Sequence, residues 1–404
     1  MGLCETDIDG LKVGRENPTR VMGVINLSPE SFYGGSVATS RDEIVRQVQE
    51  IEREGADIID VGAASSAPKS IYGTTRVGAD QELTRVSEAF KSIVDNTHLP
   101  VSIDTTSATV AHAALDLGAA LVNDVSGLRT DNKMGKLVAD ADVPIILMAD
   151  CGEPCLGLDA TLDTLKTSMK KAIEEGIGYE RIVVDPGIGF GKPTDVDLSI
   201  IRNLRRFTLL ERPLLVGVSR KAFIGQLLGQ PDPAARIVGT IAATSLAVAN
   251  GADMIRAHDV EEARMAAIIG RALRHSSLMT RDNIELMDLS NEREAALVIE
   301  QLGADAEIVH PLAEKAVMLS FRIREAPTSA ALIIKQEMLA VGGDAAYHHD
   351  VIDHRTDHTD ILIMGTPLQL GRMTKRISKM QYFRLIDIAK GIQSLMADRS
   401  RQVG

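Results

Sequence analysis

The sequence is poor in aromatic residues and has very few cysteines. It contains no Trp, and Phe, Trp and Tyr together make up 3% of its 404 residues. This scarcity argues against a surface on which the bases of single-stranded nucleic acid stack, and it leaves aliphatic side chains to fill the core. The three cysteines, Cys4, Cys151 and Cys155, are too few for a disulfide framework in a chain of this length. The cysteine content therefore fits a reducing compartment.

The sequence also lacks long apolar segments and an excess of positive charge. No apolar run reaches the roughly 18 residues that a membrane-spanning helix requires, and the first residues lack the basic and apolar stretches of a secretory signal. With 44 Lys and Arg against 56 Asp and Glu, the formal charge is −12. This balance disfavours nucleic acid or an anionic membrane as a partner, although a local cationic pocket is compatible with it. We expect a cytoplasmic protein that acts on small molecules.

Short runs rich in Val, Ile and Leu recur along the first two thirds of the sequence. Continuous rather than alternating apolar runs are typical of parallel strands that are buried on both faces. Glycines stand between several helical stretches and the next run, as helix C-caps do (Gly55, Gly118 and Gly251). Eight runs, the number that closes a (β/α)8 TIM barrel, lie at 20–26, 56–62, 100–105, 119–125, 144–149, 181–186, 213–218 and 252–258.

Helical apolar spacing separates these runs, and the pattern changes after residue 278. Within the barrel we expect helices at 44–54, 82–94, 109–117, 162–175, 200–204, 236–249 and 260–273. Beyond it, the pattern predicts strands at 283–290, 316–323 and 359–365, with helices at 291–304, 328–349, from 367, and at 382–396. The predicted organisation is an α/β chain with a TIM barrel at 1–278, opened by a short hairpin across its bottom, and a small C-terminal α/β domain at 279–404.

Polar residues stand at the ends of the apolar runs. In a closed barrel, the C-terminal ends of the strands meet at one mouth, which is where such folds hold their chemistry. Buried carboxylates need donors, such as the N–H groups of a flat heterocycle, while basic residues favour an anion and an Asn oxygen can ligate Mg2+. The alternative is that each carboxylate caps the next helix and that the Asn opens a turn. These strand-end residues are Asn26, Asp104, Asn123, Asp185, Lys221, Arg256 and His258.

Three further patterns give weaker signals. Residues 185–192, DPGIGFGK, are rich in Gly but match neither a Walker A loop nor a dinucleotide fingerprint. Cys151 and Cys155 lack the spacing of a redox or zinc pair, so we expect them to have a packing role. His and Asp residues are dense at 348–358, where a solvated loop is favoured over a metal site.

Ordered segments of the first domain closely resemble dihydropteroate synthase, the pterin-binding barrel enzyme of folate synthesis. From about Arg20 to Leu273 they read NLSPESF, GADIIDVGAASSAP, VSIDT, VNDVSG, DPGIGFGK, GVSRKAFIG, GT at 239–240, and IRAHD. The resemblance implies a transferase that joins a dihydropterin-CH2 pyrophosphate to an arylamine, p-aminobenzoate, and releases pyrophosphate. It also implies Mg2+ as cofactor and a homodimer formed through barrel helices.

The resemblance assigns roles to individual residues. The pterin would be held by Asp104, Asn123, Asp185 and Lys221, with Met148 beside the ring. Mg2+ and pyrophosphate would be held by Asn26, Arg256 and His258, with Asn26 as the metal ligand. Residues expected to act directly in catalysis are Asp185, Lys221 and Asn26, and those expected near the arylamine are Phe190, Ser219 and Ser66.

Two loops depart from the family pattern. Residues 65–68 read Ser-Ser-Ala-Pro where the family usually has Ser-Thr-Arg-Pro, and Tyr33 replaces an acidic residue. This variant resembles methanopterin-route relatives, whose amine is ribofuranosylaminobenzene phosphate, although intact loop lengths keep p-aminobenzoate ahead. A pterin-dependent methyltransferase and a non-catalytic pterin-binding module also fit a pterin pocket. The methyltransferase is disfavoured because it would need neither Arg220 and Lys221 after the seventh strand nor Arg256 and His258 for pyrophosphate. The C-terminal domain resembles an accessory domain of some dihydropteroate synthases, with no role that its sequence indicates.

Overall fold

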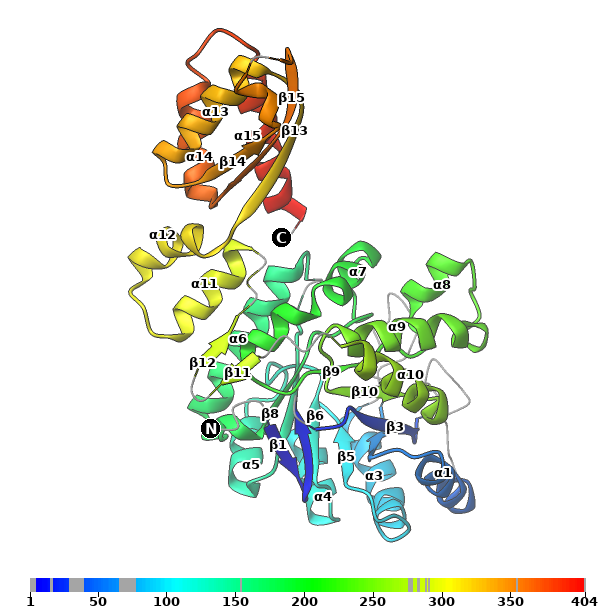
Figure 1. Ribbon diagram of the computed structural model, residues 1–404. Helices are drawn as coiled ribbons and strands as arrows, with labels where there is room; N and C mark the ends of the chain where they lie inside the picture. Colours follow the sequence, from blue (N-terminus) through cyan, green and yellow to red (C-terminus); the bar gives the residue numbers. More distant parts are fainter. Residues whose placement is uncertain are drawn as a thin grey trace. The chain divides into compact units, whose positions relative to one another are not determined.

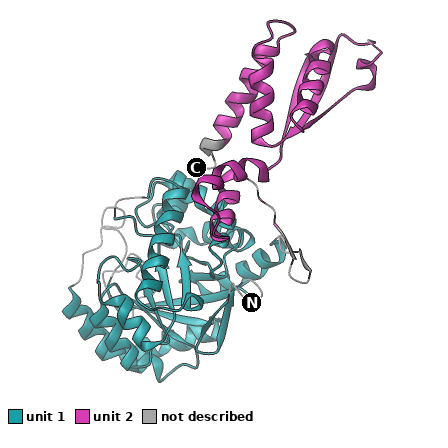
Figure 2. Cartoon of the chain, turned by 90° about the vertical axis from the view of Figure 1, so that its left-hand side faces the viewer, with its two compact units in different colours: residues 1–275 teal, residues 276–404 magenta. Residues whose placement is uncertain are grey.

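The chain divides into two compact units, residues 1–275 and 276–404 (Figure 2), and each is described by itself. The sequence-based boundary falls after residue 278. The computed structural model describes residues 5–14, 17–28, 40–64, 78–152, 155–274, 279–281, 284–287, 289, 291–353 and 355–402.

Unit 1 is a closed parallel barrel surrounded by helices (Figure 1). All neighbouring strands in the sheet order β8-β7-β6-β5-β4-β3-β10-β9 are parallel, and a parallel bridge between Val184 and Leu214 joins its two ends. The predicted (β/α)8 TIM barrel is therefore confirmed. The barrel strands are β3 (Arg20–Asn26), β4 (Ile58–Gly62), β5 (Val101–Asp104), β6 (Leu121–Asp124), β7 (Ile145–Met148), β8 (Ile182–Asp185), β9 (Leu215–Val216) and β10 (Met254–Ala257).

Helices follow the strands along the chain and cover the outside of the barrel (Figure 1). Two of them, α5 and α8, were not expected, because segments of eight and seven residues are too short to show a clear helical period. The α-helices described in unit 1 are α1 (Arg41–Arg53), α3 (Ala79–Val94), α4 (Ala108–Asp116), α5 (Met134–Ala141), α6 (Leu158–Glu174), α7 (Thr194–Arg202), α8 (Ala222–Leu228), α9 (Ile237–Ala249) and α10 (Val260–Leu273).

A hairpin of β1 (Glu5–Ile8) and β2 (Leu11–Gly14) covers the bottom of the barrel. Its residues Ile8 and Val13 are fully buried in one apolar cluster with residues from the first halves of most barrel strands. The hydroxyl of Thr6 also donates to the carbonyl of Ile182, the first residue of β8, at 3.3 Å. The bottom is thus filled by apolar side chains, which leaves the opposite end for polar chemistry.

Unit 2 is a three-stranded antiparallel sheet covered by helices, preceded by a small hairpin of β11 (Met279–Arg281) and β12 (Ile284–Leu286). The sheet order is β13-β15-β14, and a single apolar core joins the sheet to the helices. The sheet strands are β13 (Leu319–Pro327), β14 (Asp344–Tyr347) and β15 (His358–Gly365), and the helices are α11 (Glu292–Gln301), α12 (Ala306–Ala316), α13 (Thr328–Ala340), α14 (Pro367–Ile377) and α15 (Leu385–Gln402).

The single helix expected at 328–349 is wrong, because α13 ends at Ala340 and β14 follows it. Gly342 adopts a φ of +85°, which terminates the helix, and a Cβ on Gly343 would come within 2.3 Å of the Met338 side chain. Helix α12 was also not expected, and it contains Pro311 within its span. The two glycines therefore mark a turn between elements rather than an interruption within one helix.

The expected packing role of Cys151 and Cys155 needs correction, because a disulfide joins these two residues. It links the segment after β7 to the start of α6, with the two Cα atoms 5.5 Å apart. No helix in the described part of the chain is long and apolar enough to cross a membrane.

Candidate functional site

The C-terminal ends of the barrel strands bring the predicted polar residues to one mouth. The strand registers pair Asp104 with Asn123 across β5 and β6, and Met148 with Asp185 across β7 and β8. Seven of the predicted residues line one pocket there. Its lining consists of Asn123, Val125, Asp185, Ile188, Phe190, Gly217, Ser219, Lys221, Arg256 and His258.

Arg256 links two buried carboxylates of neighbouring strands. Its Nε donates to Oδ2 of Asp60 at 2.6 Å, and its Nη2 donates to Oδ2 of Asp104 at 2.9 Å. Although burial opposes a charge on this guanidinium, Asp60 and Asp104 raise its pKa. Burial raises the pKa of Asp104, and Arg256 offsets this only in part. The three groups form a charge network. The sequence predicted Asp104 and Arg256 as site residues, but it did not predict Asp60.

Asp60 was missed, although its signal was visible in the sequence. It lies in the middle of the apolar run ADIIDVG, and a carboxylate within a fully buried strand requires a specific partner. Asp60 also accepts from the side-chain amide of Asn123 at 3.2 Å. The remaining oxygens, Oδ1 of Asp60 and Oδ1 of Asn123, are buried and find no hydrogen-bond partner among the residues that the structure describes. Two acceptors are thus left for donors from elsewhere.

Asn26 and Met148 lie at the ends of their strands beside this network. A Cβ placed on Gly62 would be 3.5 Å from Oδ1 of Asn26 and 3.8 Å from Oδ2 of Asp104, so both oxygens lie close to the same point. Met148 is almost fully buried, and its side chain approaches Gly187 of the loop after β8. The missing side chain of Gly62 therefore leaves room for an oxygen-lined space at the end of β4.

Asp185 and Lys221 line the same mouth from the end of β8 and from the segment after β9. Asp185 accepts from the backbone N–H of Gly187 at 2.8 Å, yet burial raises its pKa above the ordinary value. Burial and the nearby Arg256 lower the pKa of Lys221 to about 8, although Asp185 opposes the shift. The Lys221 ammonium lies 4.2 Å from the centre of the Phe190 ring, within cation–π range. Phe190 thus contacts the same cation that faces the acidic residues.

His258 contributes a neutral ring rather than the positive charge expected from its sequence context. Burial and repulsion from Arg256 lower its pKa to about 3. Its Nδ1 lies 2.9 Å from Oγ of Ser219, which also accepts from the His258 backbone N–H at 3.3 Å. Because Ser219 accepts that N–H, its hydroxyl is suited to donate to Nδ1, which leaves Nε2 of the neutral ring as a donor.

Arg220, between Ser219 and Lys221, does not add positive charge to the mouth. Its guanidinium forms a bidentate pair with Asp259 at 2.6 and 2.9 Å and also donates to two backbone carbonyls, those of Pro233 and Ala234. Its φ of +55° reverses the chain between Ser219 and Lys221. Arg220 is therefore a structural residue that orients its two neighbours.

The glycine-rich loop after β8 has an internal lysine that the sequence analysis did not assign. Lys192 is buried, and its ammonium donates to the carbonyl of Gly187 at 2.8 Å. Asp197 accepts from the backbone N–H of Gly189 at 3.0 Å, and burial raises its pKa to about 6. These contacts fix the loop that carries Phe190. The loop is thus held by its own charges rather than shaped as a phosphate cradle.

Some predicted features lie outside the described residues. These are Ser66 with the rest of loop 65–77, and Tyr33 within 29–39.

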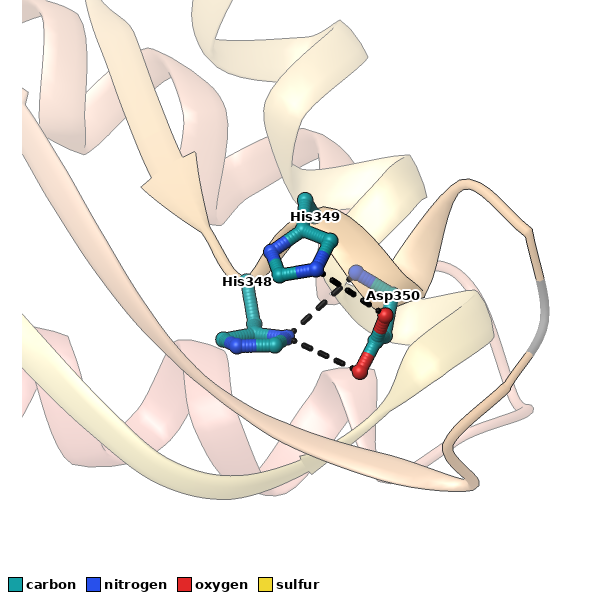
Figure 3. Close-up of side chains that lie close together, drawn as sticks. All are labelled: His348, His349 and Asp350. Atoms are coloured by element: carbon teal, nitrogen blue, oxygen red, sulfur yellow. Dashed lines mark hydrogen bonds and ion pairs between the residues drawn. The ribbon is translucent and has the colours of Figure 1, made fainter.

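The His and Asp residues near position 350 gather only in part. Ligand atoms of His348, His349 and Asp350 lie within 4.8 Å of one another on the surface of unit 2 (Figure 3). Asp350 lies 3.4 Å from Nδ1 of His348 and 3.2 Å from Nε2 of His349. The rings themselves are exposed. Since these side chains satisfy one another at the surface, the geometry resembles the solvated loop more than a built metal site.

Comparisons with known proteins place this barrel in a family. Residues 22–258 match the family model described as pterin binding enzyme. The dihydropteroate synthase of Bacillus subtilis is 38% identical over 258 residues, covering 63% of this chain and 89% of that protein. The structure of the Xanthomonas albilineans dihydropteroate synthase with 4-aminobenzoic acid is similar at 35% identity and a TM-score of 0.60, covering 67% of this chain and 98% of that one. The structure of a Clostridium difficile dihydropteroate synthase in the presence of pteroic acid is similar at 35% identity and a TM-score of 0.59, covering 64% of this chain and 97% of that one.

The barrel, its polar mouth and these matches define a pterin-binding enzyme, and the chain belongs to that family. Within it, the similarity over nearly the whole length of the relatives places the chain among the dihydropteroate synthases.

The single variants Gly189→Ala and Gly191→Ala should distinguish the effect of backbone strain from an effect on the Lys221 side chain. Both have positive φ, +76° and +82°, so Ala at either position should destabilise the fold by about 1–2 kcal/mol in urea unfolding. Only at Gly189 would the new Cβ meet the Lys221 side chain, at 2.8 Å, whereas at Gly191 it meets nothing within 4 Å. We expect Gly189→Ala alone to weaken the binding of inorganic pyrophosphate, by about tenfold in titration calorimetry. Equal affinities of the two variants would contradict the placement of Lys221.

Proposed function

We propose that this protein is a dihydropteroate synthase-type transferase that joins dihydropterin-CH2 pyrophosphate to p-aminobenzoate and releases pyrophosphate. The observation that carries the proposal is the gathering of buried acceptors and two cations at a single barrel mouth. The identity of the relatives adds support from outside the chain.

The acidic and amide residues suit the donor edge of a pterin. Oδ1 of Asp60 and Oδ1 of Asn123 have no partner among the described residues, and burying such acceptors without donors costs free energy. Amino and ring N–H groups of a pterin would satisfy them. Asp185, whose pKa is raised by burial, would gain donors that favour its charged form. Met148 would then lie along the face of the ring.

The basic residues of the mouth suit pyrophosphate. Lys221, which the resemblance assigned to the pterin, supplies positive charge for pyrophosphate as well. Arg256 presents a guanidinium that already pairs with Asp60 and Asp104, and neutral His258, oriented by Ser219, supplies a hydrogen-bond donor. The oxygen of Asn26 fits Mg2+, which prefers oxygen ligands and retains waters and substrate phosphates in its shell. When bound, Mg2+ would neutralise charge that develops on the departing pyrophosphate. One protein oxygen is consistent with a metal that is held mainly by the substrate.

The reaction needs a carbon–oxygen bond to break and a carbon–nitrogen bond to form. The bond between the methylene carbon and the pyrophosphate oxygen breaks, and its electron pair leaves with pyrophosphate. The arylamine nitrogen then attacks the methylene carbon and loses one proton. Lys221, Arg256 and His258 would stabilise the departing charge, while Asp185 would stabilise the cation that develops on the pterin. Phe190 and Ser219, together with Ser66, would contact the arylamine.

The site must also exclude water while pyrophosphate departs, because water would otherwise attack the methylene carbon in place of the amine. Asp185, Lys221 and Ser219 are buried and the other side chains of the mouth are at least partly buried, so the reacting groups would be largely shielded from bulk solvent. In such a site the electrostatic contribution of each fixed charge is larger than in water.

p-Aminobenzoate is the proposed amine because a related structure contains 4-aminobenzoic acid. The loop at 65–68, which lacks the usual arginine, favours a different carboxylate contact or the ribosylated amine. A turnover assay with each amine decides between the two.

The test measures pyrophosphate release from dihydropterin pyrophosphate with each arylamine. We expect amine-dependent turnover, with p-aminobenzoate preferred to the ribosylated amine. Turnover with the ribosylated amine alone would reassign the substrate. Absence of turnover with both, in a chain that still binds the pterin, would indicate a non-catalytic binding module, and methyl transfer from a reduced folate would overturn the proposal.

Two variants locate the chemistry in the same assay. Asp185→Asn should lower kcat/KM by about 10- to 100-fold by weakening pterin binding, because a neutral amide with a single acceptor oxygen replaces a charged carboxylate with two. His258→Ala should chiefly impair the steps that involve pyrophosphate. Asp195→Asn, at an exposed position of α7, is the matched control and should behave like the parent. If both site variants matched the parent, the site assignment would be wrong.

The lowered pKa of Lys221 gives a pH dependence. Its charge is present below about pH 8 and lost above it, so kcat/KM should fall as the pH rises through that value. Any activity that Lys221→Arg retains should lack this fall, since Arg stays charged. The unfolded chain keeps this proton up to about 10.5, so this residue's contribution to folding stability rises with pH between about 8 and 10.5. A parent profile that is flat from pH 7 to 9.5 would exclude this role for Lys221.

We also propose a homodimer that forms through α9 and α10. These helices pack against each other and expose large apolar side chains that a monomer would leave in water, Val238, Leu246, Met265, Ile268, Ile269 and Leu273.

Ile268→Glu should convert the dimer to a monomer in sedimentation-velocity experiments, because it buries a charge in the interface. Ile173→Glu, at a similarly exposed position of α6, is the control and should leave the dimer intact. A parent chain that sediments as a monomer at micromolar concentration would refute the dimer itself.

A further inference from the structure

Unit 2 contains a pocket that belongs neither to the barrel mouth nor to the His and Asp residues near position 350. It is lined by residues of α11, α12, α14 and α15 and by the first residue of β13, and has a volume of about 660 Å3. Cavities of about 300–1,000 Å3 are typical of small-molecule sites. The lining residues are Asn291, Glu292, Arg293, Ala296, His310, Ala313, Glu314, Leu319, Pro367, Leu368, Gly371, Arg372, Lys375, Met396 and Arg399.

The floor of the pocket is apolar and made of small or flexible side chains. Ala296, Ala313 and Leu319 are buried, and Met396 is partly buried. Gly371 adds no side chain, and a Cβ built there would meet nothing within 4 Å. The space thus exists because three helices present Ala or Gly where larger residues would fill it. An apolar or aromatic group would gain free energy by displacing water from such a floor.

The rim of the pocket is predominantly basic. Four Arg and Lys residues oppose two Glu residues, and one of these, Glu292, already lies 3.8 Å from Arg399. Arg372 and Lys375 stand one turn apart on α14, and in the part of the chain that the structure describes neither side chain forms an ion pair. The protein as a whole has a net charge of −12, whereas these two adjacent cations give the rim of the apolar cavity a local positive charge.

We propose that this pocket binds a small organic anion. The apolar or aromatic body of the ligand occupies the floor formed by Ala296, Ala313 and Gly371, and its carboxylate, sulfonate or phosphate group is held by Arg372 and Lys375. A bare inorganic anion would leave the floor hydrated, and a neutral apolar molecule would leave the cations without a partner. The inference rests on unit 2 alone and is independent of the activity of the barrel.

The charge requirement is tested with three probes on the full chain. 8-Anilinonaphthalene-1-sulfonate carries both features, N-phenyl-1-naphthylamine lacks the sulfonate, and methanesulfonate lacks the aromatic body. We expect the first to bind best by fluorescence titration and calorimetry. The double variant Arg372→Glu with Lys375→Glu should weaken that binding by about tenfold or more. Lys379→Glu, which lies beyond the end of α14 and outside the pocket lining, should change the affinity by less than about twofold.

The space requirement is tested with a matched pair of glycine variants. Gly371→Leu places a side chain in the cavity, and Gly391→Leu places the same side chain on α15 outside the pocket lining; an added Cβ meets nothing within 4 Å at either site. Because Leu favours a helix over Gly, both variants should fold at least as stably as the parent. Gly371→Leu should remove the component of binding that the charge reversal weakens, and Gly391→Leu should retain it.

Three results would overturn the proposal. Unchanged binding of the anilinonaphthalene probe to Gly371→Leu would place the probe elsewhere on the chain. Binding that is insensitive to the double charge reversal would remove the role of Arg372 and Lys375. Equal, charge-dependent binding of methanesulfonate would show simple anion adsorption at a basic rim, without use of the apolar floor.

Discussion

The constraint on which the site depends is the burial of opposite charges around Arg256. Asp60 and Asp104 come from adjacent strands and Arg256 from a third, and all meet within hydrogen-bond distance at the mouth of the barrel. An isolated carboxylate at such a depth would be strongly disfavoured, and removing one partner of a buried pair costs about 3–5 kcal/mol. The network therefore fixes the polar edge of the pocket. It also sets the field that acts on the neighbouring groups.

Burial moves the ionisable groups of the mouth toward neutrality. It raises the pKa of Asp104 and Asp185, and it lowers the pKa of Lys221 and His258. A ligand that brings donors to the acidic side and anionic oxygens to the basic side would reverse these costs. The free energy lost by desolvating the site can thus return as binding energy for one particular arrangement of donors and charges.

The two ends of the barrel have different roles: the bottom stabilises the fold, and the mouth holds the polar residues of the site. At the bottom, Ile8 and Val13 of the N-terminal hairpin complete an apolar cluster that needs no polar partner. At the mouth, several left-handed backbone positions turn the chain sharply, and Arg220 and Lys192 use their charges to hold loops. Unit 2 repeats this division on a smaller scale, with an apolar core below a basic rim.

The sequence by itself determined the barrel, because eight continuous apolar runs separated by helices have few other ways to bury both faces of a parallel sheet. It also determined which residues gather at the mouth, since Asp104, Asn123 and Asp185 stand at the C-terminal ends of their strands and Lys221 shortly after one. Only the tertiary structure decided how their charges are distributed. Asp60 lies inside a run, and it became part of the site because Arg256 reaches it from a strand almost 200 residues away. Arg220 and His258 looked like sources of positive charge, but one pairs with Asp259 and the other is neutral when buried. The charge state of a side chain depends on neighbours and desolvation, and neither is local in sequence.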